Sequence, residues 1–318
     1  MESGGLRRIC VLAGWLVTAA VGLLMLTQAS GWDGFKFVAI VQALTPYLLL
    51  GVAPIAVLAC WTRTDRLAVM SSLVGVSGLI LAAPLVFAAD QPAHADDAAA
   101  VNVAAVNLLF YNPVVDEVAD ELLALDLDAI LLTEYTPDHR AVMRSHPLSE
   151  AYPYKIERAG RLATGIAFWS RYPITEEEPP RTFKQTLYIT VEAPDGPVRV
   201  LGVHPPTPIF RFDSWLDDLN IFGEVGRTVQ QPTLIIGDFN ASYWHPAFRD
   251  ILNKGFTDAH TAHGRGFSSS WPTDEWVPPF VRLDHALTGN GLVSTGVEDF
   301  AVPGSDHRGF VVSVVRAR

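Results

Sequence analysis

Three long uncharged stretches near the N-terminus constrain this chain of 318 residues more than any other feature. They cover Ile9–Trp32, Phe37–Thr62 and Leu67–Ala89, which are 24, 26 and 23 residues long. A helix of about 20 apolar residues spans a hydrocarbon core roughly 30 Å thick. We therefore expect residues 1–90 to form a membrane anchor with three transmembrane helices, at about 9–29, 37–61 and 67–89. This composition excludes a disordered chain, a disulfide scaffold and a freely soluble enzyme.

Basic residues are distributed unevenly around these stretches. Arg7 and Arg8 precede the first stretch. Arg63 and Arg66 lie between the second and the third, whereas the other connector has only Lys36. Because Lys and Arg gather in cytoplasmic loops, this pattern predicts a cytoplasmic N-terminus and places the chain after about residue 90 outside the cell membrane. A cleaved signal peptide at the N-terminus is the alternative, and it also exports the rest of the chain.

The part of the chain after the apolar stretches is acidic. The net charge is −11, and the first 96 residues contain five basic and five acidic side chains, which leaves 18 basic and 29 acidic ones for residues 97–318. Affinity for nucleic acid comes largely from Lys and Arg, so this balance argues against nucleic acid as a partner. Cys10 and Cys60 both lie in apolar stretches, so the acidic part has no thiol chemistry. The segment 91–100, rich in Pro, Ala and Asp, has the composition of a tether.

Residues 101–318 alternate between short apolar runs and amphipathic segments. In the segment 114–125, helical spacing places Val115, Val118 and Leu122 on one face, opposite a row of carboxylates. Apolar runs predict strands at 101–109, 128–133, 165–170, 187–192, 198–203, 233–236, 281–287, 295–301 and 310–315, and a second helix is expected at 212–229. This alternation is typical of one α/β domain in which helices cover packed sheets.

Polar side chains of the kinds used in catalysis lie at the ends of several of these runs. They are Asn107, Glu134, His204, Asp238, Asn240, Asp284, Asp306 and His307. Burying a charge or an amide at a strand end is unfavourable unless the group is paired or binds a metal ion. Because strand ends at one edge of a sheet converge, we expect these side chains to meet in one site.

These residues and their neighbours resemble, in order, the motifs of the endonuclease/exonuclease/phosphatase superfamily, the Mg²⁺-dependent phosphoesterases that include DNase I and neutral sphingomyelinases. The matching motifs are Val-Asn107-Leu, Thr-Glu134, residues 165–174, Gly-Val-His204, Gly-Asp238-Phe-Asn240, Leu-Asp284-His and Ser-Asp306-His307. The resemblance covers about residues 102–315. It implies an α/β fold of the DNase I-like type, a four-layer α/β/β/α sandwich, with the site at one edge of the two sheets.

The resemblance also implies a metal centre. Asn107, Glu134 and Asp306 would hold Mg²⁺, a hard ion that prefers carboxylate oxygens, and Mn²⁺ would also fit. Asn107 is alternatively a buried structural amide. His260 and His263 are a second possible pair of ligands, but they lack a suitably spaced acidic or Cys partner, so we interpret them as part of a solvated loop.

The remaining residues would act on the phosphorus centre. By the same resemblance, Asp238 would position or deprotonate the attacking water, and His204 and Asn240 would donate hydrogen bonds to phosphoryl oxygens. Asp284 would fix the tautomer of His307 and raise its basicity, and His307 would bind phosphate or transfer protons. The expected reaction is cleavage of a P–O bond.

The substrate class is inferred from location. A site held at the outer face of a membrane suggests a phosphorylated substrate in the same bilayer, such as polyprenyl diphosphate. The stretches 208–215 and 271–280, rich in Trp, Phe and Pro, have the composition of loops in the interfacial layer. The layout resembles a membrane-anchored actinobacterial branch that includes the teicoplanin-resistance membrane protein, which implies a role in antibiotic resistance.

Two other functions remain open. The first is an extracellular Mg²⁺-dependent endonuclease or exonuclease, since one site of this kind serves many phosphoesters. The second is a binding module with an inactive site, which the full set of catalytic-type residues disfavours.

Overall fold

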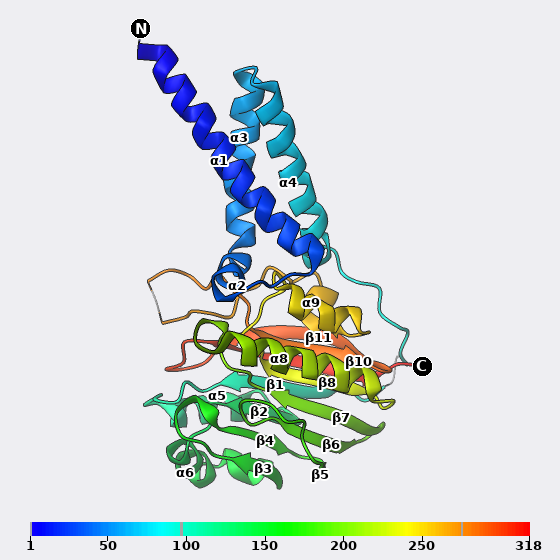
Figure 1. Ribbon diagram of the computed structural model, residues 1–318. Coiled ribbons are helices and arrows are strands. Elements are labelled where there is room, and N and C mark those ends of the chain that lie inside the picture. The colour runs from blue at the N-terminus through cyan, green and yellow to red at the C-terminus, as the bar shows by residue number, and fades with distance from the viewer. Residues whose placement is uncertain (1, 96–97, 275) are drawn as a thin grey trace.

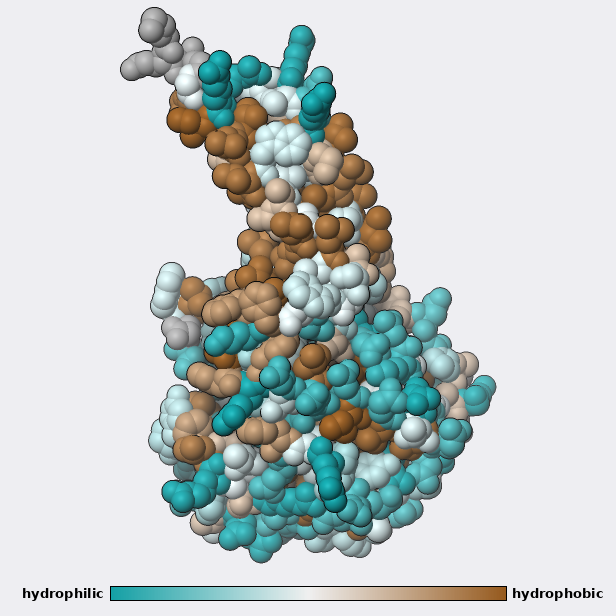
Figure 2. All heavy atoms as spheres, viewed as in Figure 1, coloured by the Kyte–Doolittle hydropathy of each residue, from teal (hydrophilic) through white to brown (hydrophobic). Residues whose placement is uncertain are grey.

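The structure is a computed structural model that describes residues 2–95, 98–274 and 276–318. Residues 96 and 97 of the predicted tether, and residue 275 of the aromatic stretch, lie outside the described residues. A bundle of helices projects from one side of an α/β domain (Figure 1). Hydrophobic residues cover the projecting helices, and hydrophilic residues gather at their far end and over the domain (Figure 2).

Two of the projecting helices are long and apolar enough to cross a membrane. They are α1 (Glu2–Ser30) and α4 (Asp65–Val86). Helices α2 (Lys36–Ala43) and α3 (Thr45–Trp61) count as a third span if they are taken as one, although they are bent by 65°. At 1.5 Å per residue, α4 extends about 33 Å, close to the thickness of a hydrocarbon core. The sequence predicted three spans, and the structure contains two or three candidates.

The predicted helix over 37–61 is broken at Leu44. Pro46 lies in the first turn of α3, and its ring and missing N–H prevent a regular helix from running through it. Before the break, Ala39 is fully buried in an apolar cluster of the domain. The carbonyl oxygen of Ala39 lies 3.0 Å from Nε2 of His245. Helix α2 therefore packs on the domain and anchors the bundle to it.

Two six-stranded sheets form the domain. Their strand orders are β11-β12-β1-β2-β4-β3 and β5-β6-β7-β8-β10-β9. β1 and β2 are parallel, as are β7 and β8, whereas the other neighbours are antiparallel. The strands are β1 (Val101–Asn107), β2 (Ala129–Thr133), β3 (Tyr154–Arg158), β4 (Ile166–Ser170), β5 (Ile174–Glu176), β6 (Leu187–Ala193), β7 (Gly196–Val203), β8 (Thr233–Asp238), β9 (Thr257–Asp258), β10 (Asp284–Gly289), β11 (Leu292–Ala301) and β12 (Arg308–Arg316).

Helices cover the outer face of each sheet. The first sheet packs against α5 (Val115–Ala124), α6 (Pro137–Ser145) and α7 (Leu148–Ala151), and the second against α8 (Pro208–Thr228) and α9 (Pro246–Asn253). The short helices η1 (Leu162–Thr164) and α10 (Ala259–Ala262) lie in connections. A third apolar cluster, which includes Leu131, Phe168 and Leu234, fills the space between the sheets. The predicted four-layer α/β/β/α sandwich is confirmed.

The interpretation of His260 as part of a solvated loop is wrong. Its side chain is completely buried in α10, with Nε2 3.1 Å from Oδ1 of Asp299. Its ring packs edge-on against Phe310. Tertiary packing over β12 therefore buries a segment whose local composition resembles a loop.

The described part of the segment 91–100 is bound to the domain. Gln91 Nε2 donates to the carbonyl oxygen of Ser294 at 2.8 Å, and Ser294 N donates to Gln91 Oε1 at 3.0 Å. The carbonyl oxygen of Ala93 accepts from Arg318 N at 2.8 Å. The described part of this segment is thus held against β11 and the last residue of the chain.

Candidate active site

The ends of strands from both sheets bring the predicted residues together. Asn107 ends β1, Glu134 follows β2, Asp238 ends β8, Asp284 begins β10 and His307 immediately precedes β12. Within the second sheet, Asp284 lies directly opposite Asp238 in the antiparallel register. The convergence predicted from strand ends is therefore present.

Asn107 joins the carboxylates of the two sheets. Its Nδ2 donates to Oε1 of Glu134 at 3.3 Å and to Oδ2 of Asp238 at 3.1 Å. Its Oδ1 accepts from Leu109 N at 3.0 Å, and Phe110 N donates to Oε2 of Glu134 at 2.9 Å. This geometry makes Asn107 a bridge between two acidic groups, and its contact with a metal ion stays a prediction.

His307 and Asp284 form a buried pair. His307 Nδ1 lies 2.7 Å from Oδ2 of Asp284, while its Nε2 lies 3.9 Å from Oδ2 of Asp238 and 4.0 Å from Oδ1 of Asp306. Burial opposes protonation of His307, but the charge and the hydrogen bond of Asp284 outweigh it and raise the pKa of His307 to about 10. The ring is thus a cation whose free N–H faces the other carboxylates.

Asp238 has the opposite electrostatic environment. Burial, and then the charge of Asp284, raise the pKa of Asp238 to about 7. Its Oδ1 accepts from Asn240 N at 2.8 Å, which leaves Oδ2 directed toward His307 and Asn107. A carboxylate with a pKa near 7 both gains and loses a proton readily at neutral pH, as a general base must.

Lys184 is a site residue that the sequence analysis missed. Its Nζ lies 2.9 Å from Nε2 of His204, and this Nε2 lies 3.5 Å from Oδ2 of Asp238. Burial, and then the charges of Lys184 and His307, lower the pKa of His204 well below its usual value. Because an ammonium can only donate, Nε2 of His204 accepts from Lys184 in this arrangement, and the predicted hydrogen bond from His204 to a phosphoryl oxygen stays a prediction. Burial also lowers the pKa of Lys184, against the charges of Asp238 and Glu134.

The hairpin of β6 and β7 positions this lysine. Leu187 lies opposite Gly202 in the register, so the residues just before β6 and just after β7 share one edge of the sheet. Lys184 lies just before β6, and His204 lies just after β7. The Asp-Gly pair at Asp195–Gly196, which favours a hairpin turn, is the local signal for this register, but it does not by itself show that Lys184 reaches His204.

Two non-glycine residues of the site adopt the left-handed backbone conformation. Glu134 has φ 57° and Asn240 has φ 47°. Such conformations are uncommon and cluster at functional sites, where surrounding contacts hold them. Asn240 Nδ2 donates to the carbonyl oxygen of Pro205 at 3.1 Å, which holds its side chain beside His204. Its predicted hydrogen bond to a phosphoryl oxygen stays a prediction.

The donor set fits a hard divalent cation. Carboxylates outnumber cationic groups, with Glu134, Asp238, Asp284 and Asp306 against Lys184 and His307. Ligand atoms of Asp238, Asp284 and His307 lie within 4.8 Å of one another, but Asp284 and His307 already bond to each other. Glu134 and Asp306 are the better candidates for holding a divalent metal ion; Asp306 lies at the rim, where its Oδ2 accepts from Trp271 Nε1 at 3.1 Å.

The sequence matches the endonuclease/exonuclease/phosphatase family over residues 101–307. The chain belongs to this family. Members of the endonuclease/exonuclease/phosphatase family are hydrolases of phosphoester bonds and typically depend on a divalent metal. The predicted family is therefore confirmed. A search of curated proteins found no match.

Several solved structures share the fold. An AP endonuclease from Archaeoglobus fulgidus superposes with a TM-score of 0.55 and 14% identity, over 67% of this chain and 98% of that one. D. rerio TDP2 complexed with single strand DNA product superposes with a TM-score of 0.55 and 12% identity, over 68% of this chain and 99% of that one. The 3′ phosphatase NExo from Neisseria, bound to a product DNA hairpin, superposes with a TM-score of 0.51 and 15% identity, over 67% of this chain and 98% of that one. The described helices before the domain lie outside the matched family segment.

Proposed function

We propose that the protein is a membrane-anchored phosphoesterase whose site faces the outside of the cell membrane. With Mg²⁺, it hydrolyses a phosphate ester or diphosphate of a lipid-linked substrate such as polyprenyl diphosphate. The observation that carries this proposal is that a phosphoesterase domain packs directly on apolar helices of membrane-spanning length. A substrate in the same bilayer is then concentrated beside the site.

The distribution of arginines supports the orientation. Arg7 Nη2 donates to the carbonyl oxygen of Thr62 at 3.1 Å, so the start of α1 lies beside the connector that carries Arg63 and Arg66. The N-terminus and the turn between α3 and α4 lie at the end of the bundle away from the domain (Figure 1), and Arg7, Arg63 and Arg66 belong to these segments. By the positive-inside bias, this end is cytoplasmic and the domain is outside.

Asp238 is the proposed base. It takes a proton from water, the resulting hydroxide attacks phosphorus, and the bond from phosphorus to the leaving oxygen breaks. A phosphate leaving group departs as an anion, so a diphosphate needs no general acid. Nε2 of His307 lies only 3.9 Å from Oδ2 of Asp238, too close for phosphorus to sit in line between them. His307 therefore donates to a non-bridging oxygen from the side of the attacking water.

Lys184 supplies a second positive group. Its ammonium lies 2.9 Å from Nε2 of His204 and interacts with the charges of Asp238 and Glu134, and in this proposal it donates to a phosphoryl oxygen as negative charge develops. A divalent ion bound by Glu134 and Asp306 would neutralise charge on the phosphoryl and leaving oxygens. The neutral ring of His204 holds the ammonium in place.

Phosphate release from polyprenyl diphosphate tests the proposed reaction. We expect the full-length protein in detergent to release phosphate with Mg²⁺ and to stop when EDTA is added. His307→Gln should lower the rate about 10²–10³-fold, the loss typical of one such donor. Glu192→Gln is the matched control, because this exposed carboxylate lies near the end of β6 that is away from Lys184 and the candidate active site. Equal rates for wild type and His307→Gln would refute the proposal.

A nuclease is the second candidate. It is favoured by the likeness in fold to structures that hold DNA products and disfavoured by the acidic domain. Plasmid cleavage that requires Mg²⁺ and is lost in His307→Gln, without release of phosphate from the lipid, would replace the first proposal with this one.

The orientation has its own test. A reporter fused after Ala98 should be active only when it lies outside the cytoplasm. Activity of a cytoplasm-specific reporter at the same position would overturn the proposed location. In this proposal the substrate is a lipid-linked wall precursor, and the resemblance of the layout to the teicoplanin-resistance membrane protein suggests a role in glycopeptide resistance.

A further inference from the structure

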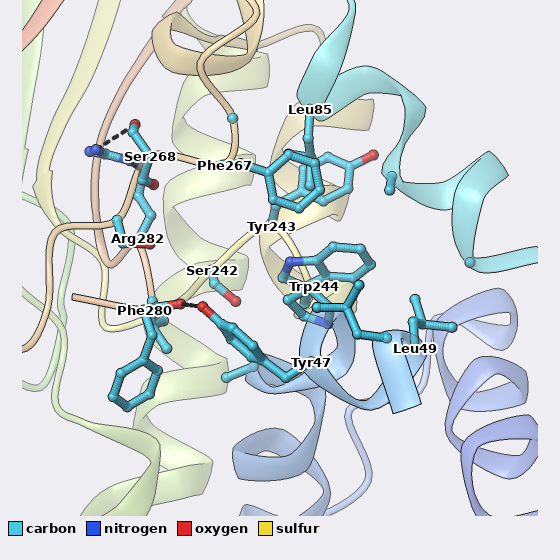
Figure 3. Close-up of a pocket in the computed structure, with 18 of the residues that line it drawn as sticks. Tyr47, Leu49, Leu85, Ser242, Tyr243, Trp244, Phe267, Ser268, Phe280 and Arg282 are labelled. Atoms are coloured by element: carbon cyan, nitrogen blue, oxygen red, sulfur yellow. Dashed lines mark hydrogen bonds between the residues drawn. The ribbon is translucent and has the colours of Figure 1, made fainter. Parts of the chain in front are cut away.

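A cavity of about 380 Å³ lies between the apolar helices and the domain (Figure 3). Helices α3 and α4 form one wall, and loops that follow β8 and precede β10 form the other. Its volume falls in the range of small-molecule sites, roughly 300–1,000 Å³. Its lining is mostly apolar and aromatic, and includes Tyr47, Leu49, Leu85, Trp244, Phe267 and Phe280.

The cavity reaches from the surface of the bundle into the domain. Leu50 and Leu79 line it and are 72% and 71% exposed, on the surface that a bilayer would surround. At the other end, Trp244 and Leu85 are buried. A Cβ added to Gly75 would meet nothing within 4 Å, so this glycine leaves open space at the wall.

The polar groups at the inner end bond to the protein itself. Arg282 donates from Nη2 to Oδ1 of Asp299 at 2.7 Å, from Nε to the carbonyl oxygen of Ser268 at 2.9 Å and from Nη1 to that of Asp284 at 3.1 Å. His285 lies 3.0 Å from the carbonyl oxygen of Ala241. With these groups occupied, the cavity suits a hydrocarbon chain and not a charged headgroup.

Two walls of the cavity are close in sequence to residues of the candidate active site. Ser242 lines the cavity two residues after Asn240, and Arg282 lines it two residues before Asp284. Tyr47 of α3 donates from Oη to the carbonyl oxygen of Phe280 at 2.7 Å. A chain in the cavity would therefore touch the two loops that position catalytic groups.

We propose that this cavity binds the hydrocarbon chain of the lipid-linked phosphate while its phosphoryl end lies in the active site. This assignment rests on the proposed function and adds a site for the lipid portion of the substrate. The position of the cavity supports this assignment, because exposed residues of the apolar helices line one side of it and residues two positions from Asn240 and Asp284 line the other.

A cavity-filling variant tests the assignment. Gly75→Leu adds a side chain at the open wall, and Gly51→Leu is the matched control, because a Cβ at Gly51 also meets nothing within 4 Å and Gly51 does not line the cavity. We measure kcat/KM for polyprenyl diphosphate and for the soluble ester bis-p-nitrophenyl phosphate. Gly75→Leu should lower the ratio of the first to the second at least tenfold, and Gly51→Leu should leave it unchanged. An unchanged ratio in Gly75→Leu would overturn the assignment.

Photolabelling separates this assignment from the proposed reaction. A polyprenyl phosphate with a diazirine in its chain should label peptides containing Trp244 or Phe267, and unlabelled polyprenyl phosphate, but not excess phosphatidylcholine, should compete. Labelling without hydrolysis would support the cavity and refute the reaction. Hydrolysis without labelling would support the reaction and refute the cavity assignment. Competition by phosphatidylcholine would show that the cavity binds a structural lipid, and it would also overturn the assignment.

Discussion

Two buried clusters of acidic and basic side chains meet at the start of β10, and only one of them, the candidate active site, has a carboxyl group whose pKa is raised toward neutral pH. The catalytic cluster comprises Asn107, Glu134, Lys184, His204, Asp238, Asp284, Asp306 and His307. The structural cluster comprises Asp258, His260, Arg282, His285 and Asp299. Asp284 and His285 are consecutive, and the alternation of a strand sends them to opposite faces of the sheet.

The clusters differ in charge balance. In the structural cluster, burial alone would raise the pKa of each carboxyl group, but His285 holds the pKa of Asp258 well below its usual value, and His260 and Arg282 do the same for Asp299. In the catalytic cluster, burial and a neighbouring carboxylate raise the pKa of Asp238 to about 7. The carboxylates of the first cluster are balanced by their own cationic partners, whereas the excess negative charge of the second can be balanced by a bound cation.

The sharpest contrast is expected from Asp238→Asn. Loss of the proposed base should lower kcat about 10³-fold, while the thermal midpoint of the full-length protein stays equal or rises, because a carboxylate with a raised pKa destabilises the fold at neutral pH. Phosphate release and thermal unfolding in detergent measure the two effects. A large loss of both stability and activity would assign Asp238 a structural role, and the two clusters would then not differ in function.

The reverse outcome is expected from Asp299→Asn. This change leaves Arg282, which is 5% exposed, without its charged partner, and should destabilise the protein by about 3 kcal/mol. The folded fraction should retain the kcat of the wild type. Glu298→Gln is the control, because this neighbour on β11 is exposed. A variant with unaltered stability would show that the structural cluster is not balanced as described.

Lys184 tests whether a positive charge belongs to the catalytic cluster. Lys184→Gln should lower kcat about 10²-fold with a smaller change in KM, since the ammonium would act mainly as charge develops in the transition state. Lys184→Arg should recover part of the rate because it restores the charge. Arg181→Gln, an exposed cation in the same loop, should change kcat little. Equal rates for the Gln and Arg variants would limit Lys184 to packing.

The sequence alone predicts the architecture of the domain well. Each predicted strand has a counterpart, from the run at 101–109, found as Val101–Asn107, to the run at 310–315, found as Arg308–Arg316. These strands are apolar on both faces because sheets and helices cover them, so their signal is strong. The strands at Tyr154–Arg158 and Ile174–Glu176 were missed, since they are short, partly exposed edge strands.

The site residues that lie at strand ends could be predicted from the sequence. Residues that reach the site only through the pairing of distant strands were harder to predict. Asp238 and Asp284 meet because their strands pair antiparallel, which their apolar runs suggest. Lys184 lies before its strand and reaches His204 only through the hairpin register. Pro46 is a local signal for the break at Leu44, but the packing of α2 against the domain after the 65° bend is a long-range contact that no local pattern shows.

The smallest expected effect is on the pH dependence of stability. The two clusters differ in the direction of this dependence, because the pKa of Asp299 is lowered and that of Asp238 is raised. Because the pKa of Asp299 is lowered in the folded protein, its ion pair contributes stability above the unfolded pKa of about 3.9 and loses it as the pH falls through the folded value. Between pH 5 and pH 3, the difference in unfolding free energy between wild type and Asp299→Asn should shrink by about 1 kcal/mol. Denaturant unfolding at the two pH values measures it, with Glu298→Gln as reference. A difference that grows toward pH 3 would mean that Asp299 is protonated more easily in the folded state, and the two clusters would then share one electrostatic character.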